Sequence, residues 1–269
     1  VPFCIRKCCY CDFASIEDLS LQHEYARAVC REMEMVKEEF PTFDTLYIGG
    51  GTPTAIDDRL LVRIMENAAS VFPFNGKPEI TLEANPGTVR IEGLERLRRA
   101  GVNRVNIGVQ SFCDANLRFL GRIHTARQGE ESIRLARRAG FDNVGLDLIY
   151  GLPGQNIRSW TADLAKALSF LPEHLSCYML TVEQGTPLFL DLAAGRVEPA
   201  PEESAAALFA KTSEFMRASG YLHYEISNFA RSADHRSRHN RKYWTLAPTL
   251  GLGPSAHSFL DTPPVRWWN

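Results

Sequence analysis

Stretches with helical periodicity alternate with short apolar stretches about six times along this chain. Two of the joints are alike, because residues 98–102 and 137–141 both place two arginines, an alanine and a glycine before an apolar segment. Such alternation predicts a parallel sheet with outer helices. Six units are too few to close an eight-stranded barrel. We therefore expect an α/β fold, a partial (β/α)6 TIM-like open barrel, with a doubly wound open sheet as the alternative.

The expected helices cover residues 17–40, 57–72, 91–100, 126–139, 157–170 and 201–219. The expected strands cover residues 45–48, 79–82, 104–109, 143–149, 174–180 and 221–226. We expect residues 1–230 to form the partial barrel, and residues 231–269 to form a connecting segment and the start of a truncated C-terminal domain. The chain opens directly on a cysteine-rich loop, so most of a first strand is expected to be absent.

Composition narrows the class of protein. The 269 residues are 45% hydrophobic, which is enough for a full core, and the formal net charge of −2 argues against a general binder of nucleic acid or membrane surfaces. No apolar run is long enough to span a bilayer, and no signal peptide is visible. The scattered cysteines Cys30, Cys113 and Cys177 suggest free thiols, so we expect a cytoplasmic protein.

Three cysteines near the start, Cys4, Cys8 and Cys11, form a C-x3-C-x2-C array. Thiolates select iron–sulfur clusters or zinc. No fourth cysteine follows at usable spacing, so a cubic [4Fe–4S] cluster held here would keep one iron open to a small ligand. Zinc is the alternative, although it usually takes four ligands. We interpret the adjacent Cys9 as a packing thiol.

A glycine-rich segment, residues 49–54, follows the first expected strand. Glycines let backbone amides approach a carboxylate or phosphate, although many such segments are only turns. The P-loop pattern is excluded because no Gly-Lys-Ser/Thr follows.

Polar residues mark three later strands. Glu83 and Gln110 end strands, and Asp147 lies among apolar residues where a buried carboxylate needs a partner. Carboxylates at these places could accept ribose hydroxyls or pair with an ammonium group; solvated strand ends or a structural ion pair are the alternatives. Arg122 could pair with a carboxylate of the ligand that carries these groups. Alternatively, it could be one of the many arginines that lie on the protein surface.

The last part of the chain is rich in histidine. His235, His239 and His257 lie in polar, glycine-rich sequence near Tyr243 and Trp244. Imidazole beside aromatic and basic groups could ligate haem iron, stack on a porphyrin and pair with propionates. The alternative is that these histidines make hydrogen bonds within loops.

Together these motifs resemble the HemN/HemW branch of the radical SAM superfamily. The resemblance rests on residues 2–13, 49–54, 83–86, 108–111, 147–153 and 224–244. It implies that Cys4, Cys8 and Cys11 hold a [4Fe–4S] cluster. It also implies that the S-adenosylmethionine site is lined by Tyr10, Gly50, Gly51, Thr52, Glu83, Gln110, Arg122 and Asp147.

Two features favour the chaperone side of that branch. Phe13 stands where the dehydrogenase type carries an additional cysteine, and residues 239–244 resemble a segment linked with haem binding. Ser237 departs from the cysteine found there in many such chains. The resemblance implies a chaperone that binds haem, with His239 as a haem contact, and passes it to acceptor haemoproteins.

The first alternative is an oxygen-independent coproporphyrinogen III dehydrogenase, which would use a 5′-deoxyadenosyl radical for oxidative decarboxylation. A zinc-clipped structural or binding protein is a further alternative. No residue is assigned a catalytic role, and whether the protein is an enzyme stays open.

Overall fold

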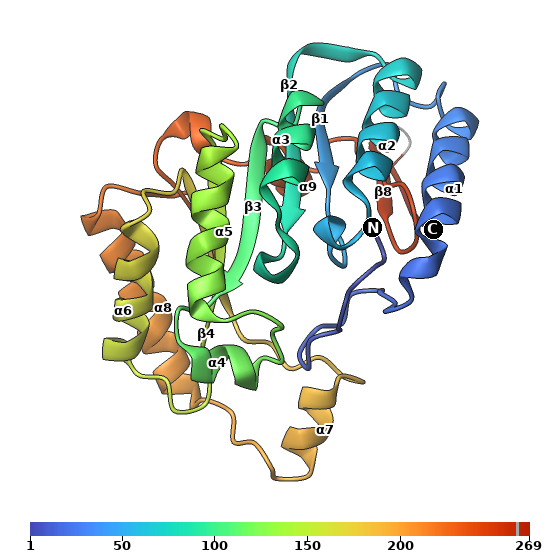
Figure 1. Cartoon of the computed structure of the whole chain (residues 1–269). Helices are drawn as coiled ribbons and strands as arrows, with labels where there is room; N and C mark the ends of the chain where they lie inside the picture. Colours follow the sequence, from blue (N-terminus) through green and yellow to red (C-terminus); the bar gives the residue numbers. More distant parts are fainter. Residues whose placement is uncertain (262–263) are drawn as a thin grey trace.

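The computed structural model describes residues 1–261 and 264–269 (Figure 1). In chain order its elements are η1 Leu19–Leu21, α1 Gln22–Met35, β1 Phe43–Ile48, η2 Pro53–Ala55, α2 Asp58–Val71, β2 Phe74–Ala84, η3 Pro86–Thr88, α3 Ile91–Arg99, β3 Arg104–Gln110, α4 Asp114–Phe119, α5 Ala126–Arg138 and β4 Val144–Tyr150. They continue with α6 Ile157–Leu168, β5 His174–Met179, α7 Pro187–Ala193, α8 Glu202–Ala218, β6 Leu222–His223, β7 Asn228–Ala230, η4 Ala233–His235, α9 Arg238–Trp244, β8 His257–Asp261 and β9 Pro264–Trp268.

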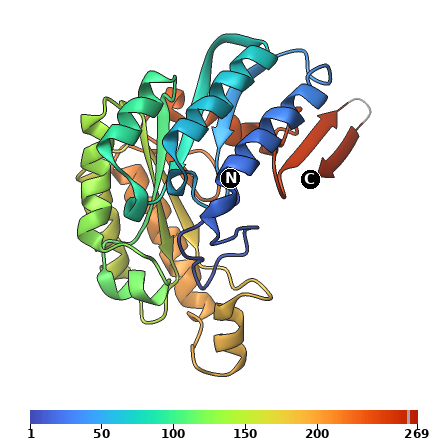
Figure 2. The same cartoon turned by 45° about the vertical axis from the view of Figure 1, so that its right-hand side comes forward.

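One curled sheet organises the molecule. Its seven strands lie in the order β1-β2-β3-β4-β5-β7-β6, and β1 to β5 are parallel. Helices α1, α2, α3, α5 and α6 follow one another along the outside of the curve (Figures 1 and 2). Consecutive parallel strands joined by outer helices are the geometry of a barrel. The predicted fold class, an open α/β barrel, is therefore confirmed.

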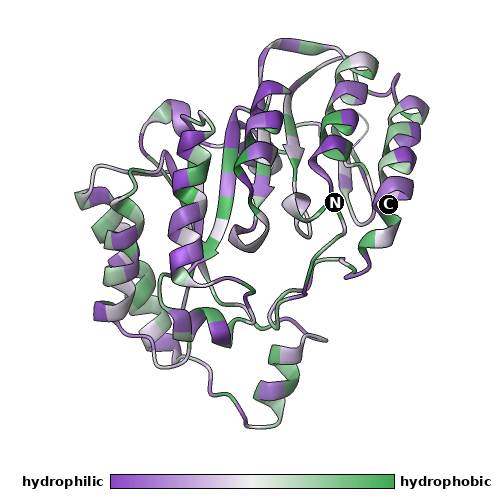
Figure 3. Cartoon of the chain, viewed as in Figure 1, coloured by the Kyte–Doolittle hydropathy of each residue, from purple (hydrophilic) through white to green (hydrophobic). Residues whose placement is uncertain are grey.

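The strands are polar on one face and apolar on the other. Successive side chains of a strand point to opposite faces. On β3, for example, Val105, Ile107 and Val109 are fully buried against the helices, whereas Asn106 and Gln110 face the inside of the curve. The helices carry both hydrophilic and hydrophobic residues (Figure 3), as an outer layer over an apolar core requires.

The structure differs from the expected last parallel strand at residues 221–226. In its place lie β6 and β7, which pair antiparallel with each other, while β7 also pairs antiparallel with β5. The chain reverses at Glu225, whose backbone oxygen accepts a hydrogen bond from the Asn228 N–H and whose carboxylate accepts one from the Ser227 N–H. Because the Glu225 side chain hydrogen-bonds to the backbone of this turn, it stabilises the turn over the continuous strand that the sequence predicts.

Other boundaries also differ. The expected helix 17–40 is shorter, because Asp18 caps η1 and the helix α1 ends before Val36. Helices α4, α7 and α9 are not in the predicted set. They are six, seven and seven residues long, too short for a hydrophobic repeat to signal them.

The end of the chain packs back on the barrel. Helix α9 contacts β1, and β8 and β9 form a separate antiparallel hairpin. We propose that residues 231–269 begin a second unit, with residues 262–263 lying outside the described part. Among the described helices, none has the length and apolar character that crossing a membrane would require.

Candidate functional site

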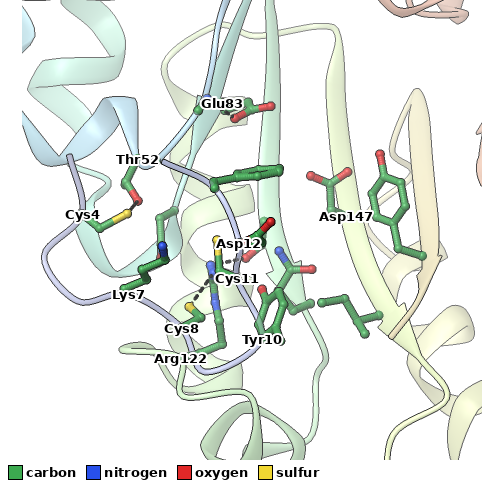
Figure 4. A pocket seen from close by; sticks show the side chains of 18 of the residues that line it. Cys4, Lys7, Cys8, Tyr10, Cys11, Asp12, Thr52, Glu83, Arg122 and Asp147 are labelled. Carbon is green, nitrogen blue, oxygen red and sulfur yellow. Dashed lines mark hydrogen bonds between the residues drawn. The ribbon is translucent and has the colours of Figure 1, made fainter. Parts of the chain in front are cut away.

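A cavity of about 630 Å³ opens at the carboxyl ends of the parallel strands. Its walls come from the cysteine loop, the glycine-rich segment after β1, the ends of β2 to β5 and the segment after α4 (Figure 4). Eleven residues named from the sequence line it: Cys4, Cys8, Tyr10, Cys11, Gly50, Gly51, Thr52, Glu83, Gln110, Arg122 and Asp147. The cavity therefore brings together all the predicted cluster and S-adenosylmethionine residues, and leaves out His239.

Backbone hydrogen bonds close the cysteine loop. The Cys4 N–H donates to the Ile16 carbonyl at 2.9 Å, and the Ile16 N–H donates to the Pro2 carbonyl at 2.7 Å. Within the loop the Cys11 N–H donates to the Cys8 carbonyl at 3.2 Å. These contacts close the loop, and all three predicted ligand thiols belong to residues that line the cavity.

The thiols differ in their contacts. Cys4 Sγ is hydrogen-bonded to Thr52 Oγ1 at 3.4 Å, and the Arg122 guanidinium donates to Cys8 Sγ at 3.5 Å (Figure 4). Burial raises the pKa of the Cys11 thiol. In the described ranges, 1–261 and 264–269, no three His, Cys, Asp or Glu side chains are gathered closely enough to hold a metal. The Cys9 thiol donates elsewhere, to the Phe119 carbonyl at 3.2 Å.

Glu83 is fixed on the β1 side of the cavity. The Tyr47 hydroxyl donates to Glu83 Oε1 at 2.6 Å, and the Gly50 N–H donates to Oε2 at 3.2 Å. Burial raises the pKa of this carboxyl, while the Tyr47 hydrogen bond acts in the opposite direction. The side chain is therefore oriented to accept from, or pair with, a positive or hydroxyl-bearing group in the cavity.

Asp147 lies on the opposite wall and is oriented by Asn106, which donates a hydrogen bond to its Oδ2. Burial raises the pKa of the Asp147 carboxyl. The second oxygen, Oδ1, is buried and has no hydrogen-bond partner among residues 1–261 and 264–269. A buried acceptor of this kind costs free energy unless a ligand or water satisfies it.

Gln110 and Arg122 occupy the floor between these walls. Gln110 has a φ of 67°, at a point where the pairing of β3 with β4 shifts register. Arg122 donates to the Gly108 carbonyl at 2.8 Å. In the described part of the chain, Gln110 Oε1 and Arg122 Nε are buried without hydrogen-bond partners. Backbone strain at a residue that lines a cavity is typical of a binding site.

His239 lies elsewhere, on α9 against β1. Its ring stacks on Tyr47, with the centroids 4.8 Å apart and the planes at 23°. Nδ1 is hydrogen-bonded to Thr45 Oγ1 and Nε2 to the Tyr243 hydroxyl, each at 3.0 Å. Burial, then the nearby Lys242, lowers the pKa of His239 to about 4.

The other two histidines lie on other elements than His239. His235 is hydrogen-bonded to Ser232 within its own turn, at 2.9 Å. His257 lies on β8 beside Trp268, with the ring centroids 6.1 Å apart. His239 and His257 nevertheless line one cavity of about 690 Å³, together with Tyr47 and Tyr243, and His235 is not among its lining residues.

Sequence reasoning missed several residues at the cavity and behind it. Asn106 and Tyr178 line it, and Tyr47 supports Glu83 from behind. A signal was present for Asn106, because it precedes Gln110 by four residues and the two-residue period puts both on the same face of one strand. The sequence does not show which strands lie next to one another in the sheet.

The cavity suits the cofactors that the cysteine array predicts. Three thiols line one part of it, and unpaired polar atoms of Asn106, Gln110, Arg122 and Asp147 lie in the rest. The oxygen atoms suit an ammonium group or ribose hydroxyls, and the guanidinium suits a carboxylate. An iron–sulfur cluster with S-adenosylmethionine offers this combination of groups.

Comparison with known proteins agrees with this chemistry. Residues 1–167 match the Radical SAM superfamily. The chain is 38% identical to the heme chaperone HemW of Bacillus subtilis over 265 residues, which is 97% of this chain and 69% of that protein. It is 33% identical to the heme chaperone HemW of Escherichia coli over 271 residues, covering 99% of this chain and 70% of that protein.

A solved structure is also similar. Coproporphyrinogen III oxidase (HemN) from Escherichia coli, described as a radical SAM enzyme, matches with a TM-score of 0.81 and 25% identity. The match covers 96% of this chain and 63% of that one, so this chain spans less than two thirds of the solved protein. On this evidence the chain belongs to the radical SAM superfamily and, within it, to the HemW family.

Proposed function

We propose that this protein is a cytoplasmic haem chaperone that binds a [4Fe–4S] cluster, S-adenosylmethionine and haem, and passes haem to acceptor haemoproteins. The observation that carries the proposal is the similarity, over nearly the whole chain, to two proteins named heme chaperone HemW. The seven cysteines are all free, as a reducing compartment allows.

In this proposal Cys4, Cys8 and Cys11 hold three irons of the cluster. When bound, the cluster and S-adenosylmethionine supply redox and radical chemistry. Thr52 and Arg122 contact two of the cysteine thiols, and their hydrogen bonds would support the negative charge of thiolate ligands.

The remaining residues bind and orient S-adenosylmethionine. Arg122 would pair with its carboxylate, and Glu83 would accept from its ammonium or ribose hydroxyls. Asp147 and Gln110 would accept through the oxygen atoms that have no protein partner. Tyr10 and the backbone of Gly50 to Thr52 would close the wall beside the cysteine loop.

His239 is the proposed haem contact. With the ring proton on Nδ1, the ring donates to buried Thr45 and keeps the Nε2 lone pair for the Tyr243 hydroxyl, which is easily displaced because Tyr243 is 51% exposed. A low pKa keeps the imidazole neutral, which is the form that ligates metals. Iron binding at Nε2 would then require Tyr243 to move away from that nitrogen.

The test is anaerobic reconstitution of the chain, with iron and sulfide counted and haem titrated into the same sample. We expect about four irons per chain, as a [4Fe–4S] cluster requires, and a saturable Soret band that His239→Ala weakens. Absence of saturable haem binding in the unsubstituted protein would contradict the proposal.

A second candidate is the coproporphyrinogen III dehydrogenase reaction, favoured by the similarity to the HemN structure. Phe13, where the dehydrogenase type carries another cysteine, argues against it. An anaerobic assay for protoporphyrinogen decides between them, because a chaperone forms none. A colourless protein that contains zinc would instead favour a zinc-clipped binding protein.

A further inference from the structure

A line of contacts leads from helix α9 to the cofactor cavity. The His239 ring stacks on the Tyr47 ring, and the Tyr47 hydroxyl donates to Glu83 at 2.6 Å. Glu83 lines the cavity together with Gly50, whose N–H it also accepts. The imidazole is thus two contacts away from the cavity, although it does not line it.

The contact between Tyr47 and Glu83 leaves little freedom. A Cβ atom at Gly49 would lie 2.7 Å from Tyr47 Cε1 and 2.9 Å from Glu83 Oε2. Real Cβ atoms do not come this close to their neighbours, so only glycine lets the ring and the carboxylate meet here. Because the Tyr47 hydroxyl donates to the Glu83 carboxylate at 2.6 Å, a shift of the tyrosine ring would move the carboxylate or break this hydrogen bond.

The position of the imidazole is itself fixed by the strands that carry this pair. Glu79 of β2 accepts hydrogen bonds from the backbone N–H groups of Arg238 and His239, at 3.1 and 3.0 Å. Thr45 of β1 is hydrogen-bonded to His239 Nδ1. Asp44 forms ion pairs with Arg238 and Lys242 of α9, at 3.1 and 2.6 Å.

We infer that His239 is a positioning residue for the cofactor cavity: by covering one face of Tyr47, it holds the Tyr47 hydroxyl on Glu83 and so sets where the Glu83 carboxylate points. The inference rests on the proposed function in one respect, namely that Glu83 contacts bound S-adenosylmethionine. It adds a coupling between the two ligands. Haem that draws His239 away from Tyr47 lowers the affinity for S-adenosylmethionine, and by linkage S-adenosylmethionine lowers the affinity for haem by the same factor.

The test measures S-adenosylmethionine affinity by calorimetry on the anaerobically reconstituted chain. Tyr47→Phe keeps the ring but removes the hydroxyl, and should weaken binding about tenfold, as expected for one hydrogen bond to a carboxylate. His239→Ala should weaken it about threefold or more, within the range of an aromatic pair. His239→Phe, which restores a flat ring over Tyr47, should recover most of that loss. His23→Ala, an exposed histidine on α1, is the matched control and should change nothing.

The double variant separates positioning from general damage. If His239 acts through Tyr47, then Tyr47→Phe with His239→Ala is no weaker than Tyr47→Phe alone, whereas independent effects would add. Additive losses, or unchanged affinity in both single variants, would overturn the inference. Adding haem to the unsubstituted chain should weaken S-adenosylmethionine binding, and an unchanged affinity at haem saturation would remove the coupling.

Haem titration of the same variants keeps the two proposals distinct. His239→Phe should lose haem affinity while it retains S-adenosylmethionine affinity, because phenylalanine supplies a ring but no ligand atom. If the unsubstituted chain binds no haem, the chaperone proposal fails and the positioning role is judged by S-adenosylmethionine affinity alone.

Discussion

Asn106 donates a hydrogen bond from Nδ2 to Oδ2 of Asp147, at 2.5 Å, across the neighbouring strands β3 and β4. Among the described residues the contact leaves Asp147 Oδ1 buried and unpaired, and the side chain lines the cavity shared with the cysteine loop. One oxygen is therefore used to orient the side chain, and the other remains for a ligand.

Asp147→Asn should weaken S-adenosylmethionine binding about tenfold or more, since an amide retains the shape but loses the charge that attracts a donor. Calorimetry on the reconstituted protein measures the effect, and a thermal melt shows whether the fold is retained. Asp142→Asn, an exposed aspartate on the loop before β4, is the control. Equal affinity in the Asp147 variant and its control would rule out this ligand role.

Single Cys→Ser substitutions at positions 4, 8 and 11 should each reduce the iron retained after anaerobic reconstitution, because serine is a poor ligand for iron in a cluster. Cys9→Ser is the matched control within the same loop, since its thiol donates to the Phe119 carbonyl. Iron and sulfide analysis with the absorption spectrum is the measurement. Loss of iron on replacing Cys9, with retention on replacing Cys4, would reverse the assignment.

Gln110→Gly should raise the free energy of unfolding while it weakens cofactor binding. Glutamine at a φ of 67° is in the left-handed region, which costs about 1 kcal/mol for a residue other than glycine. Gln110→Ala separates the two effects, since it removes the side chain but keeps the strain. Urea unfolding and calorimetry measure them, and a glycine variant less stable than the alanine variant would argue against stored strain.

Glu79→Ala should loosen helix α9. The carboxylate accepts two backbone N–H groups at the start of that helix, and loss of such a cap costs about 1–2 kcal/mol. Hydrogen exchange at the amides of Arg238 and His239 reports the local change. Glu92→Ala, in the first turn of α3, is a suitable comparison. Protection at the two amides equal to that of the unsubstituted protein would contradict the capping role.

The protein should lose stability as the pH falls from about 6.5 to about 4, and His239 should contribute to the loss. In the folded state its pKa is lowered to about 4, against about 6.5 in an unfolded chain. Between those values the unfolded state binds the proton and the folded state does not, so unfolding becomes easier as the pH falls. Above about pH 6.5 His239 is neutral in both states, so it adds nothing to the pH dependence of the unfolding free energy.

His239→Gln is the variant that isolates this contribution, because His124 and His174 also have lowered pKa values and titrate in both proteins. We expect the difference in unfolding free energy between the two proteins to change between pH 6.5 and 4, and to stay constant above that range. Chemical denaturation across the pH series is the measurement. A difference that does not vary with pH would mean that His239 titrates normally.

Local sequence patterns predicted much of the molecule. Short apolar stretches located the five parallel strands, and the 3.6-residue period located the long helices, because a buried strand is apolar and a helix buries one face. The array of Cys4, Cys8 and Cys11 predicted the cavity wall, since residues this close in sequence must share a loop. Glu83, Gln110 and Asp147 were identifiable as polar residues near the carboxyl ends of strands, which meet at one edge of a parallel sheet.

Other features depended on contacts between distant parts of the chain. The two predicted carboxylates are hydrogen-bonded by residues of neighbouring strands, Glu83 by Tyr47 and Asp147 by Asn106. The order of the strands in the sheet cannot be inferred from any single segment of the sequence. The same is true of His239, which the motif associated with a ligand but the structure places on Tyr47. The predicted residues at the cavity come from short sequence motifs and from the family resemblance that those motifs carry. Their orientation is decided only by the tertiary structure, because it depends on which side chains the folded sheet brings within hydrogen-bonding distance.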